Sequence, residues 1–368
     1  MNNNNMNTIE ACRYCFMCRH VCGSSLISCK ESDTPRGRAI LLYSIYRGGK
    51  KYTPDIIESI YNCLLCGCCL GWCEGREEGG YNMPDLIQAA RFDIVNKGLE
   101  PPIVKKMKEF LVNHDNLYGI NINEAFTYNI KESKSQVLVY LGSEVNFKNK
   151  EIAHAANGIF KKLGIDFSFM KNELNSGKEL LILGFKQEAK RKMNDLFNRI
   201  KKSKCRLLVT TDPLAYDAFK NDYPEMGFNL EPDIQVQHIS QFVLNYIKEK
   251  KIVIKKFNEK VTLVDSEYLG TFNGVFEEPR EIITTSAGSN FIEMIWNREK
   301  SLATGEAAFV FNGSYFQQGK KLIEYICAEL HNMKIKNVIV LSAKAKRYIK
   351  ECFTFNVYDI TEFISNML

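Results

Sequence analysis

The sequence lacks the features that would place it in a membrane or secretory class. No apolar run reaches eighteen residues, so we expect no transmembrane segment. Residues 1–8 are rich in asparagine and have neither a charged start nor an apolar stretch, which argues against a signal peptide. No arginine-rich or aromatic-interleaved basic stripe stands out, so the formal net charge of +6 does not indicate a nucleic-acid partner.

Motifs for nucleotide binding and hydrolytic catalysis are missing as well. The sequence contains no Gly-x-Gly-x-x-Gly fingerprint and no Walker loop, and only five histidines are present. The composition is otherwise ordinary, because 45% of the 368 residues are hydrophobic and 25% are charged. These values exclude a wholly disordered or fibrous chain, and the length favours two or three domains.

Cysteine is the residue whose distribution stands out. The chain has thirteen cysteines, and ten of them lie between Cys12 and Cys73. An odd count, the missing export signal and such crowding argue against a disulfide scaffold in a chain of this length. They favour thiolates that are kept reduced, in the cytoplasm, and that serve as metal ligands.

Eight of these cysteines form two copies of the spacing Cys-x2-Cys-x2-Cys-x3-Cys. This spacing suits a cubane iron–sulfur cluster, because three cysteines wrap one loop around a cluster while the fourth reaches a neighbouring one. With two copies the ligands are therefore expected to cross. The predicted sets for two [4Fe–4S] clusters are Cys12, Cys15, Cys18 and Cys73 for cluster 1, and Cys63, Cys66, Cys69 and Cys22 for cluster 2.

Zinc is the alternative to iron and sulfur, but structural zinc sites usually present two well-separated ligand pairs. Cys68 adjoins Cys69 and could compete for its ligand position, although Cys69 keeps the spacing of the motif. We therefore predict that Cys29 and Cys68 are thiols outside the ligand sets. Three further cysteines are predicted to be small core residues, because free cysteine is often simply buried: Cys205, Cys327 and Cys352.

Arginines are crowded around the first motif. A four-thiolate cluster carries net negative charge, so nearby cations would favour its reduced form and raise its potential. The alternative is a solvated or docking face, and the two roles are compatible. The predicted tuning residues are Arg13, Arg19, Arg36 and Arg38.

The chain divides into two regions that differ in their pattern of apolar residues. Residues 1–112 are predicted to form a helical domain that contains the cysteines, with helices over Ala39–Tyr46, from Met83 to Gly98 and from Pro102 to near Asn113. Residues 113–135 are rich in asparagine, lack periodicity and are predicted to be a linker.

From residue 136 onward, short apolar runs alternate with amphipathic stretches. The predicted strands are Val137–Leu141, Leu180–Leu183, Leu207–Thr210, Val261–Val264, Ala308–Phe311 and Val338–Leu341. The predicted helices are Lys150–Lys162, Gln187–Lys202 and Gly319–Met333. The alternation indicates an α/β fold with mainly parallel sheets, and the pattern occurs twice, so residues 136–250 and 251–368 are predicted to be two similar lobes.

The first hundred positions resemble iron–sulfur proteins related to heterodisulfide reductase, including the iron–sulfur subunit of glycolate oxidase. Both cysteine motifs, their separation and the intervening Asp33-Thr34-Pro35-Arg36-Gly37-Arg38 carry the resemblance. It implies that the N-terminal part is a dicluster ferredoxin-like domain.

The resemblance continues weakly to the C-terminus, where each lobe of the family carries a Cys-Cys-Gly motif with companion cysteines. Here the corresponding positions hold other residues, among them Ser143, Asp212, Thr304 and Ser342. Such side chains do not supply the thiolates that an iron–sulfur cluster needs. We therefore expect a retained fold that has lost its metal site.

The resemblance implies an electron-transfer subunit. Its expected partner is an FAD-binding dehydrogenase subunit of the 2-hydroxyacid oxidase type, together with an electron-transfer flavoprotein or a ferredoxin. A second hypothesis is a catalytic reductase subunit with a ligand site in the C-terminal cleft, where Asp212, Asp265 and Glu267 follow strands; the alternative for these acids is helix capping or solvent exposure. A third is a non-redox scaffold stabilised by metal.

Overall fold

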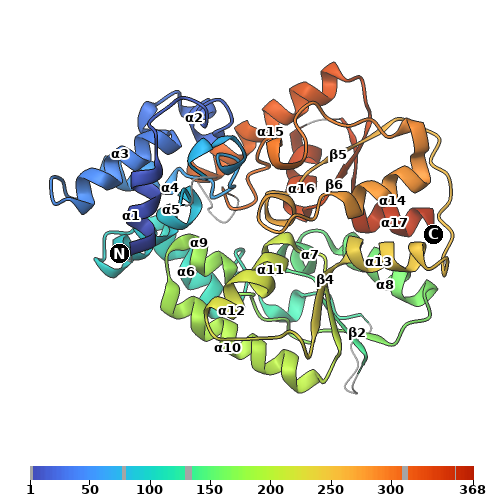
Figure 1. Ribbon diagram of the computed structural model, residues 1–368. Helices are drawn as coiled ribbons and strands as arrows, with labels where there is room; N and C mark the ends of the chain where they lie inside the picture. Colours follow the sequence, from blue (N-terminus) through green and yellow to red (C-terminus); the bar gives the residue numbers. More distant parts are fainter. Residues whose placement is uncertain (1–2, 77–79, 129–134, 309–313, 353) are drawn as a thin grey trace.

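The computed structural model describes residues 3–76, 80–128, 135–308, 314–352 and 354–368. Figure 1 shows a helical N-terminal part beside two α/β lobes, with the chain passing from the first lobe to the second. The N-terminal helices are α1 (Asn3–Ala11), α2 (Gly23–Ser28), α3 (Pro35–Tyr46), α4 (Pro54–Tyr61), α5 (Met83–Asn96) and α6 (Pro102–His114).

Local sequence explains where these helices begin. Thr34 and Thr53 accept hydrogen bonds from backbone N–H groups in the first turns of α3 and α4, and each threonine is followed by a proline, whose missing N–H costs nothing at this position. Asn82 caps α5 in the same way. The three helices predicted in this region are confirmed, and α3 begins at Pro35, four residues before the predicted start.

The first lobe is built on a four-stranded parallel sheet in the order β2-β1-β3-β4. Its strands are β1 (Val137–Tyr140), β2 (Phe167–Phe169), β3 (Leu207–Thr210) and β4 (Gln235–His238). Its helices are α7 (Ser143–Phe147), α8 (Lys150–Lys162), α9 (Lys178–Leu183), α10 (Lys186–Ser203), α11 (Pro213–Asp217), α12 (Tyr223–Glu225) and α13 (Ile239–Lys248).

The second lobe has a three-stranded parallel sheet in the order β5-β6-β7 among the described residues. Its strands are β5 (Val261–Val264), β6 (Asn337–Val340) and β7 (Asn356–Asp359). Its helices are α14 (Glu277–Ala287), α15 (Ser314–Asn332), α16 (Ala343–Cys352) and α17 (Ile360–Met367). The predicted α/β character with parallel sheets is confirmed. The strand predicted at Ala308–Phe311 falls almost wholly outside the described residues.

One predicted strand is wrong, because Leu180–Leu183 lies in helix α9. A short, wholly apolar run fits a buried helix as well as a buried strand, and here only one of the four residues, Ile182, is β-branched. Gly184 adopts a φ of 104° at the end of α9, a conformation that ends the helix and that other residues rarely adopt. The helix is buried on all sides because α5, α6, α10 and α11 pack around it.

Edge strands β4 and β7 escaped the sequence analysis because polar residues interrupt them. Each is four residues long, begins with an exposed residue, and ends in a residue that caps the next helix. His238 and Asp359 both form capping boxes, with Gln241 and Glu362 three residues on. Each lobe thus ends in a strand followed by a helix that begins with a capping box, which supports the expected similarity of the lobes.

The parts of the molecule are packed against one another through helices. Helix α17 of the second lobe packs on α8 of the first, and α13 packs on α14, so the lobes share one hydrophobic core. The N-terminal part meets the first lobe through α5 and α6 against α9, and meets the second through α2 against α15. Part of the predicted linker 113–135 is packed as well, because Asn116, Leu117 and Phe126 are buried.

Acidification is expected to weaken the first lobe through His238. This residue is fully buried, and burial lowers the pKa of its ring to about 3. Because an unfolded histidine titrates near 6.5, the stability that His238 contributes is present above that pH and is lost as pH falls toward 3. We expect the wild type to lose about 2 kcal/mol between pH 7 and pH 5 relative to His238→Asn, as measured by urea unfolding. Equal losses in both proteins would contradict this.

Candidate iron–sulfur site

The structure brings the eight motif cysteines together as two sets of four. The first cavity is lined by Cys12, Cys15, Cys18 and Cys73. The second cavity is lined by Cys22, Cys63, Cys66 and Cys69. Each cavity is lined by the four cysteines that the spacing predicts as one ligand set. Within the described residues, no three or more His, Cys, Asp or Glu side chains converge on a single-ion position; the thiols of each set instead surround a space.

The two motifs share an unusual backbone conformation at the same position. Tyr14 and Leu65, each two residues after the first cysteine of its motif, have φ values of 51° and 49°. Non-glycine residues rarely adopt this left-handed conformation, and it is often found at functional sites. Burial raises the pKa of Cys12 and of Cys63, and a hydrogen bond from the backbone N–H of Tyr14 or Leu65 to the respective sulfur offsets part of this rise.

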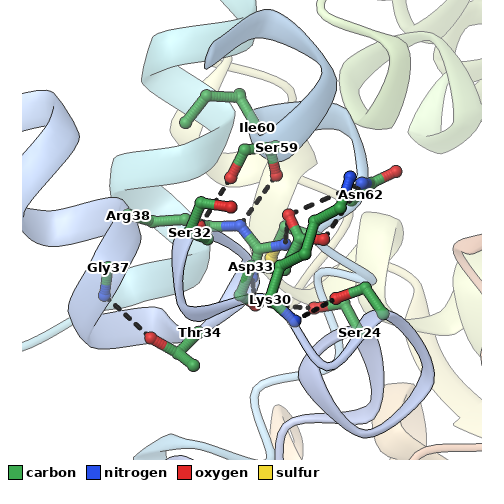
Figure 2. A network of polar contacts seen from close by, with 12 residues as sticks. Ser24, Lys30, Ser32, Asp33, Thr34, Gly37, Arg38, Ser59, Ile60 and Asn62 are labelled. Carbon is green, nitrogen blue, oxygen red and sulfur yellow. Dashed lines mark hydrogen bonds and ion pairs between the residues drawn. The ribbon is translucent and has the colours of Figure 1, made fainter. Parts of the chain in front are cut away.

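The start of helix α3 is packed tightly against the residues that precede it. A Cβ atom on Gly37 would lie 2.0 Å from the carbonyl oxygen of Glu31, so only glycine fits there. The backbone N–H of Gly37 donates to the Thr34 hydroxyl at 2.8 Å (Figure 2). This close approach explains the Pro-Arg-Gly-Arg segment: it fixes the positions from which Arg36 and Arg38 extend toward different cysteine sets.

Arg36 contacts the loop that lines the first cavity. Its guanidinium donates to the carbonyl oxygen of Tyr14 at 3.0 Å, pairs with Glu31 at 2.7 Å and lies over the Phe16 ring at 4.2 Å. It therefore fixes the loop that carries Cys15. Of the other predicted tuning residues, Arg13 lines this cavity, whereas Arg19 is exposed and lies 4.0 Å from Glu31.

Arg38 lines the second cavity and is almost wholly buried. Figure 2 shows it enclosed by backbone and side-chain acceptors: its guanidinium donates to the carbonyl oxygens of Asp33 at 2.6 Å and Ser59 at 2.8 Å. It also reaches the Cys22 sulfur at 4.0 Å and the Asp33 carboxylate at 3.6 Å. A buried positive charge therefore lies directly beside one predicted ligand set.

The sequence analysis missed a second buried arginine, Arg91 of α5. Its guanidinium donates to the carbonyl oxygen of Cys63 at 2.6 Å and to that of Ile182 in α9 at 2.7 Å. It thus joins a predicted ligand to the first lobe. The sequence pattern could have identified Arg91 as a buried residue, because Ile87, Arg91 and Ile94 follow the helical spacing of the buried face of α5. An arginine on such an apolar face indicates a buried partner.

Burial and charge act in opposite directions on the predicted ligands. Burial raises the pKa of Cys18 to about 12 and also raises that of Cys63. The positive charges of Arg38 and Arg91 lower the pKa of Cys63 and so favour its thiolate, the form that binds metal. The residues present thus fit a metal cluster, which would supply further positive charge at each set of thiols.

Aromatic packing ties the second motif to the second lobe. Trp72, the residue before Cys73, packs edge-on against His20 with 4.5 Å between ring centroids, and lies 5.8 Å from Trp296 of the second lobe. The side chain of Lys300 lies over the Trp72 ring at 5.2 Å. The loop that carries Cys73 therefore rests on the second lobe.

None of the four other cysteines with described side chains lines either four-cysteine cavity, although the Cys68 sulfur lies 4.0 Å from the carbonyl oxygen of Cys66. Cys29 is exposed, and Cys68 is buried beside Leu64 and Leu322; neither lines a four-cysteine cavity. Cys205 and Cys327 are buried in the lobes. The side chain of Cys352 lies outside the described residues.

A third cavity lies between the two lobes and follows strands β1, β3 and β6. Asp212, Ser342 and Lys344 line it, and the described residues that line it include no cysteine. Asp212 also caps α11, accepting from the N–H of Leu214 at 2.9 Å. Two of the three acids considered for catalysis do not line it.

Those two acids hold the second lobe together. Asp265 pairs with both terminal nitrogens of Arg280, at 2.8 Å and 2.7 Å. Glu267 accepts from the backbone N–H of Thr304 at 3.1 Å and from that of Gly305 at 2.8 Å. The carboxylate oxygens of both acids accept hydrogen bonds from groups within the second lobe, so both acids have a structural role.

No protein-family model matches the chain. Among characterised sequences, it is 26% identical over 316 residues to a probable iron-sulfur-binding oxidoreductase of Bacillus subtilis, FadF, covering 78% of this chain and 42% of that protein. It is 27% identical over 247 residues to one of the subunits of the dihydromethanophenazine:CoB–CoM heterodisulfide reductase of Methanosarcina mazei, covering 64% of this chain and 59% of that protein. The chain is thus similar to iron–sulfur proteins, among them a subunit of heterodisulfide reductase.

A third relative is the EtfAB:quinone oxidoreductase of Syntrophomonas wolfei, which is 23% identical over 265 residues, covering 67% of this chain and 36% of that protein. The chain thus spans between about a third and three fifths of the length of these relatives. None of the described helices has the length and apolarity needed to cross a lipid bilayer.

Proposed function

We propose that the chain is an electron-transfer subunit that holds two [4Fe–4S] clusters in an N-terminal dicluster ferredoxin-like domain, residues 1–112. The observation that carries the proposal is the pair of cavities, each lined by the four cysteines of one crossed set. The names of the relatives support iron–sulfur chemistry. When bound, such clusters accept and donate electrons singly.

The chain's own residues would hold the clusters, exclude water and set the local charge. Cys12, Cys15, Cys18 and Cys73 would bind one cluster, and Cys63, Cys66, Cys69 and Cys22 the other. Arg36 fixes the loop of the first set and Arg38 places positive charge beside the second. A reductive titration tests the proposal: the purified protein should take up about two electrons, one for each cluster. Uptake of none would contradict it.

We propose further that the electrons pass between an FAD-linked dehydrogenase of the 2-hydroxyacid oxidase type and another carrier, in the cytoplasm. The family resemblance supports the dehydrogenase, and the relative named EtfAB:quinone oxidoreductase supports an electron-transfer flavoprotein as the other carrier. The odd number of cysteines and the crowding of ten of them between Cys12 and Cys73 support a reducing compartment. Purification of the native protein should recover a flavoprotein; repeated isolation of the chain alone would contradict the assignment of this partner.

The catalytic alternative has less support, because Asp265 and Glu267 are engaged within the second lobe and only Asp212 of the three lines the interlobe cavity. We therefore propose that residues 136–250 and 251–368, the two lobes, serve as a packed platform for other subunits. Turnover of a small-molecule donor by the isolated chain would favour the catalytic alternative instead.

Replacing Arg38 with glutamine should make the second-set cluster harder to reduce. The substitution removes a buried positive charge 4.0 Å from the Cys22 sulfur, so the reduced, more negative cluster loses stabilisation. We expect its midpoint potential to fall by on the order of 50 mV, with the other cluster unchanged, in a redox titration followed by electron paramagnetic resonance. Arg38→Lys keeps the positive charge, so the midpoint potential should fall less in this variant. Equal losses in both variants would indicate a positioning role for Arg38 in place of a charge effect.

A further inference from the structure

Large apolar side chains are exposed at the end of the molecule that carries the first motif. Phe16 is 62% exposed, and four others in the loop and in α3 are between 39% and 47% exposed. The set is Tyr14, Phe16, Met17, Ile40 and Tyr43. Arg36 joins the loop to the helix, because it contacts both the Tyr14 carbonyl and the Phe16 ring. Exposed apolar groups that gather in this way mark interaction sites.

Helix α3 turns one face outward beside the loop. Arg36, Ile40, Tyr43 and Arg47 are four, three and four residues apart, so they lie along one face of the helix. Figure 1 shows α3 at the left edge of the molecule, on the side away from both lobes. The guanidinium of Arg47 lies over the Tyr43 ring at 5.5 Å. The surface thus has an aromatic and aliphatic centre, and arginine lies at both ends of its helical part.

The same segment holds most of the chain's excess positive charge. Residues 10–51 contain eight lysines and arginines and three acids, a net charge of +5, compared with +6 for all 368 residues. The two exposed acids are already paired: Glu31 with Arg36 and Glu10 with Arg47. The third, Asp33, is buried beside Arg38. Because these ion pairs also neutralise Arg36, Arg38 and Arg47, the excess charge of +5 is carried by the other five cations of the segment, Arg13, Arg19, Lys30, Lys50 and Lys51.

We propose that this face, made of residues 14–17 and the outward side of α3, docks an acidic electron-carrier protein. The inference rests on the proposed function and names its partner by charge. Cys15 is exposed in the docking loop, so a partner seated there would lie against the first cysteine set. Aromatic residues, methionine and arginine are the residues enriched at protein interfaces, and opposite charge on the partner would steer its approach.

Binding of an acidic flavodoxin, followed by isothermal titration calorimetry of the full chain, tests the docking face. We expect affinity to fall at least tenfold between 20 mM and 300 mM salt, because the contact is between opposite charges. Phe16→Ala with Arg47→Glu should weaken binding at least tenfold at low salt. Lys190→Glu on α10 makes a charge change of the same size on an exposed residue of the first lobe and should leave affinity unchanged. A basic c-type cytochrome should not bind.

The outcomes separate this proposal from the function on which it rests. If the iron content is as proposed, but flavodoxin binding is insensitive to salt and to the double variant, the docking face is wrong and the cluster assignment stands. If the clusters are absent, the proposed function fails whatever the binding result. A dimer in sedimentation equilibrium that Phe16→Ala dissociates would mean that a second copy covers this face, and would also overturn the proposal.

Discussion

Changing Cys22 and Cys63 together to serine is expected to leave about four of the eight irons in place. Both sulfurs line the same cavity, so the double change damages one cluster and spares the other. Pairing Cys12→Ser with Cys22→Ser should instead disrupt both clusters, because these cysteines belong to the same motif but line different cavities. Iron analysis of anaerobically purified variants provides the measurement.

The two double variants discriminate crossed from uncrossed ligation because the alternative reverses the result. If each motif bound its own cluster, the first pair would lose both clusters and the second pair only one. Cys29→Ser with Cys68→Ser is the matched control: neither sulfur lines a four-cysteine cavity, and the iron content should stay at the wild-type value. Loss of iron in that control would mean that one of these thiols is a ligand.

Replacing Arg91 with alanine should be the most damaging change away from the cysteines. Its guanidinium is fully buried and donates to four backbone carbonyls, those of Ile60, Tyr61, Cys63 and Ile182. Its removal leaves these acceptors without their donor and opens a cavity. We expect a loss of about 3–5 kcal/mol in the free energy of unfolding, measured by anaerobic chemical denaturation.

A matched control and a milder variant separate burial from charge. Arg199→Ala removes an exposed arginine of α10 that donates to the carbonyl of Asn172 at 2.8 Å, and it should change stability by about 0.5 kcal/mol or less. Arg91→Lys keeps the charge but cannot reach four carbonyls with one ammonium, so we expect an intermediate loss. If Arg91→Ala were as mild as the control, the carbonyl contacts would not be stabilising the junction with α9.

The grouping of the eight motif cysteines could be predicted from the sequence because their spacing along the chain limits which thiols can share a cavity. The interval between Cys12 and Cys22, repeated from Cys63, limits which sulfurs can share a cluster, and the structure places the four members of each predicted set around one cavity. The Pro-Arg-Gly-Arg segment could be identified as characteristic, but its reason could not: only the fold shows that Glu31 leaves no room for a Cβ at Gly37.

One element and two residues were assigned wrongly or missed for the same physical reason: burial depends on partners that lie far away in the chain. Leu180–Leu183 is as apolar as a buried strand, and it is buried as a helix because α5 and α6 pack on it. Arg91 could be seen to interrupt an apolar stripe, but its acceptors include Ile182, ninety-one residues away. Asp265 follows a strand as a catalytic acid would, and its pairing with Arg280 is visible only once α14 is placed.

Iron and acid-labile sulfide analysis of the anaerobically purified wild-type chain tests the central claim most directly. Two four-iron clusters predict about eight irons and eight sulfides per chain, a brown colour and paramagnetic signals on reduction. A colourless protein that contains zinc, or one whose motif cysteines are joined in disulfides, would contradict the electron-transfer account.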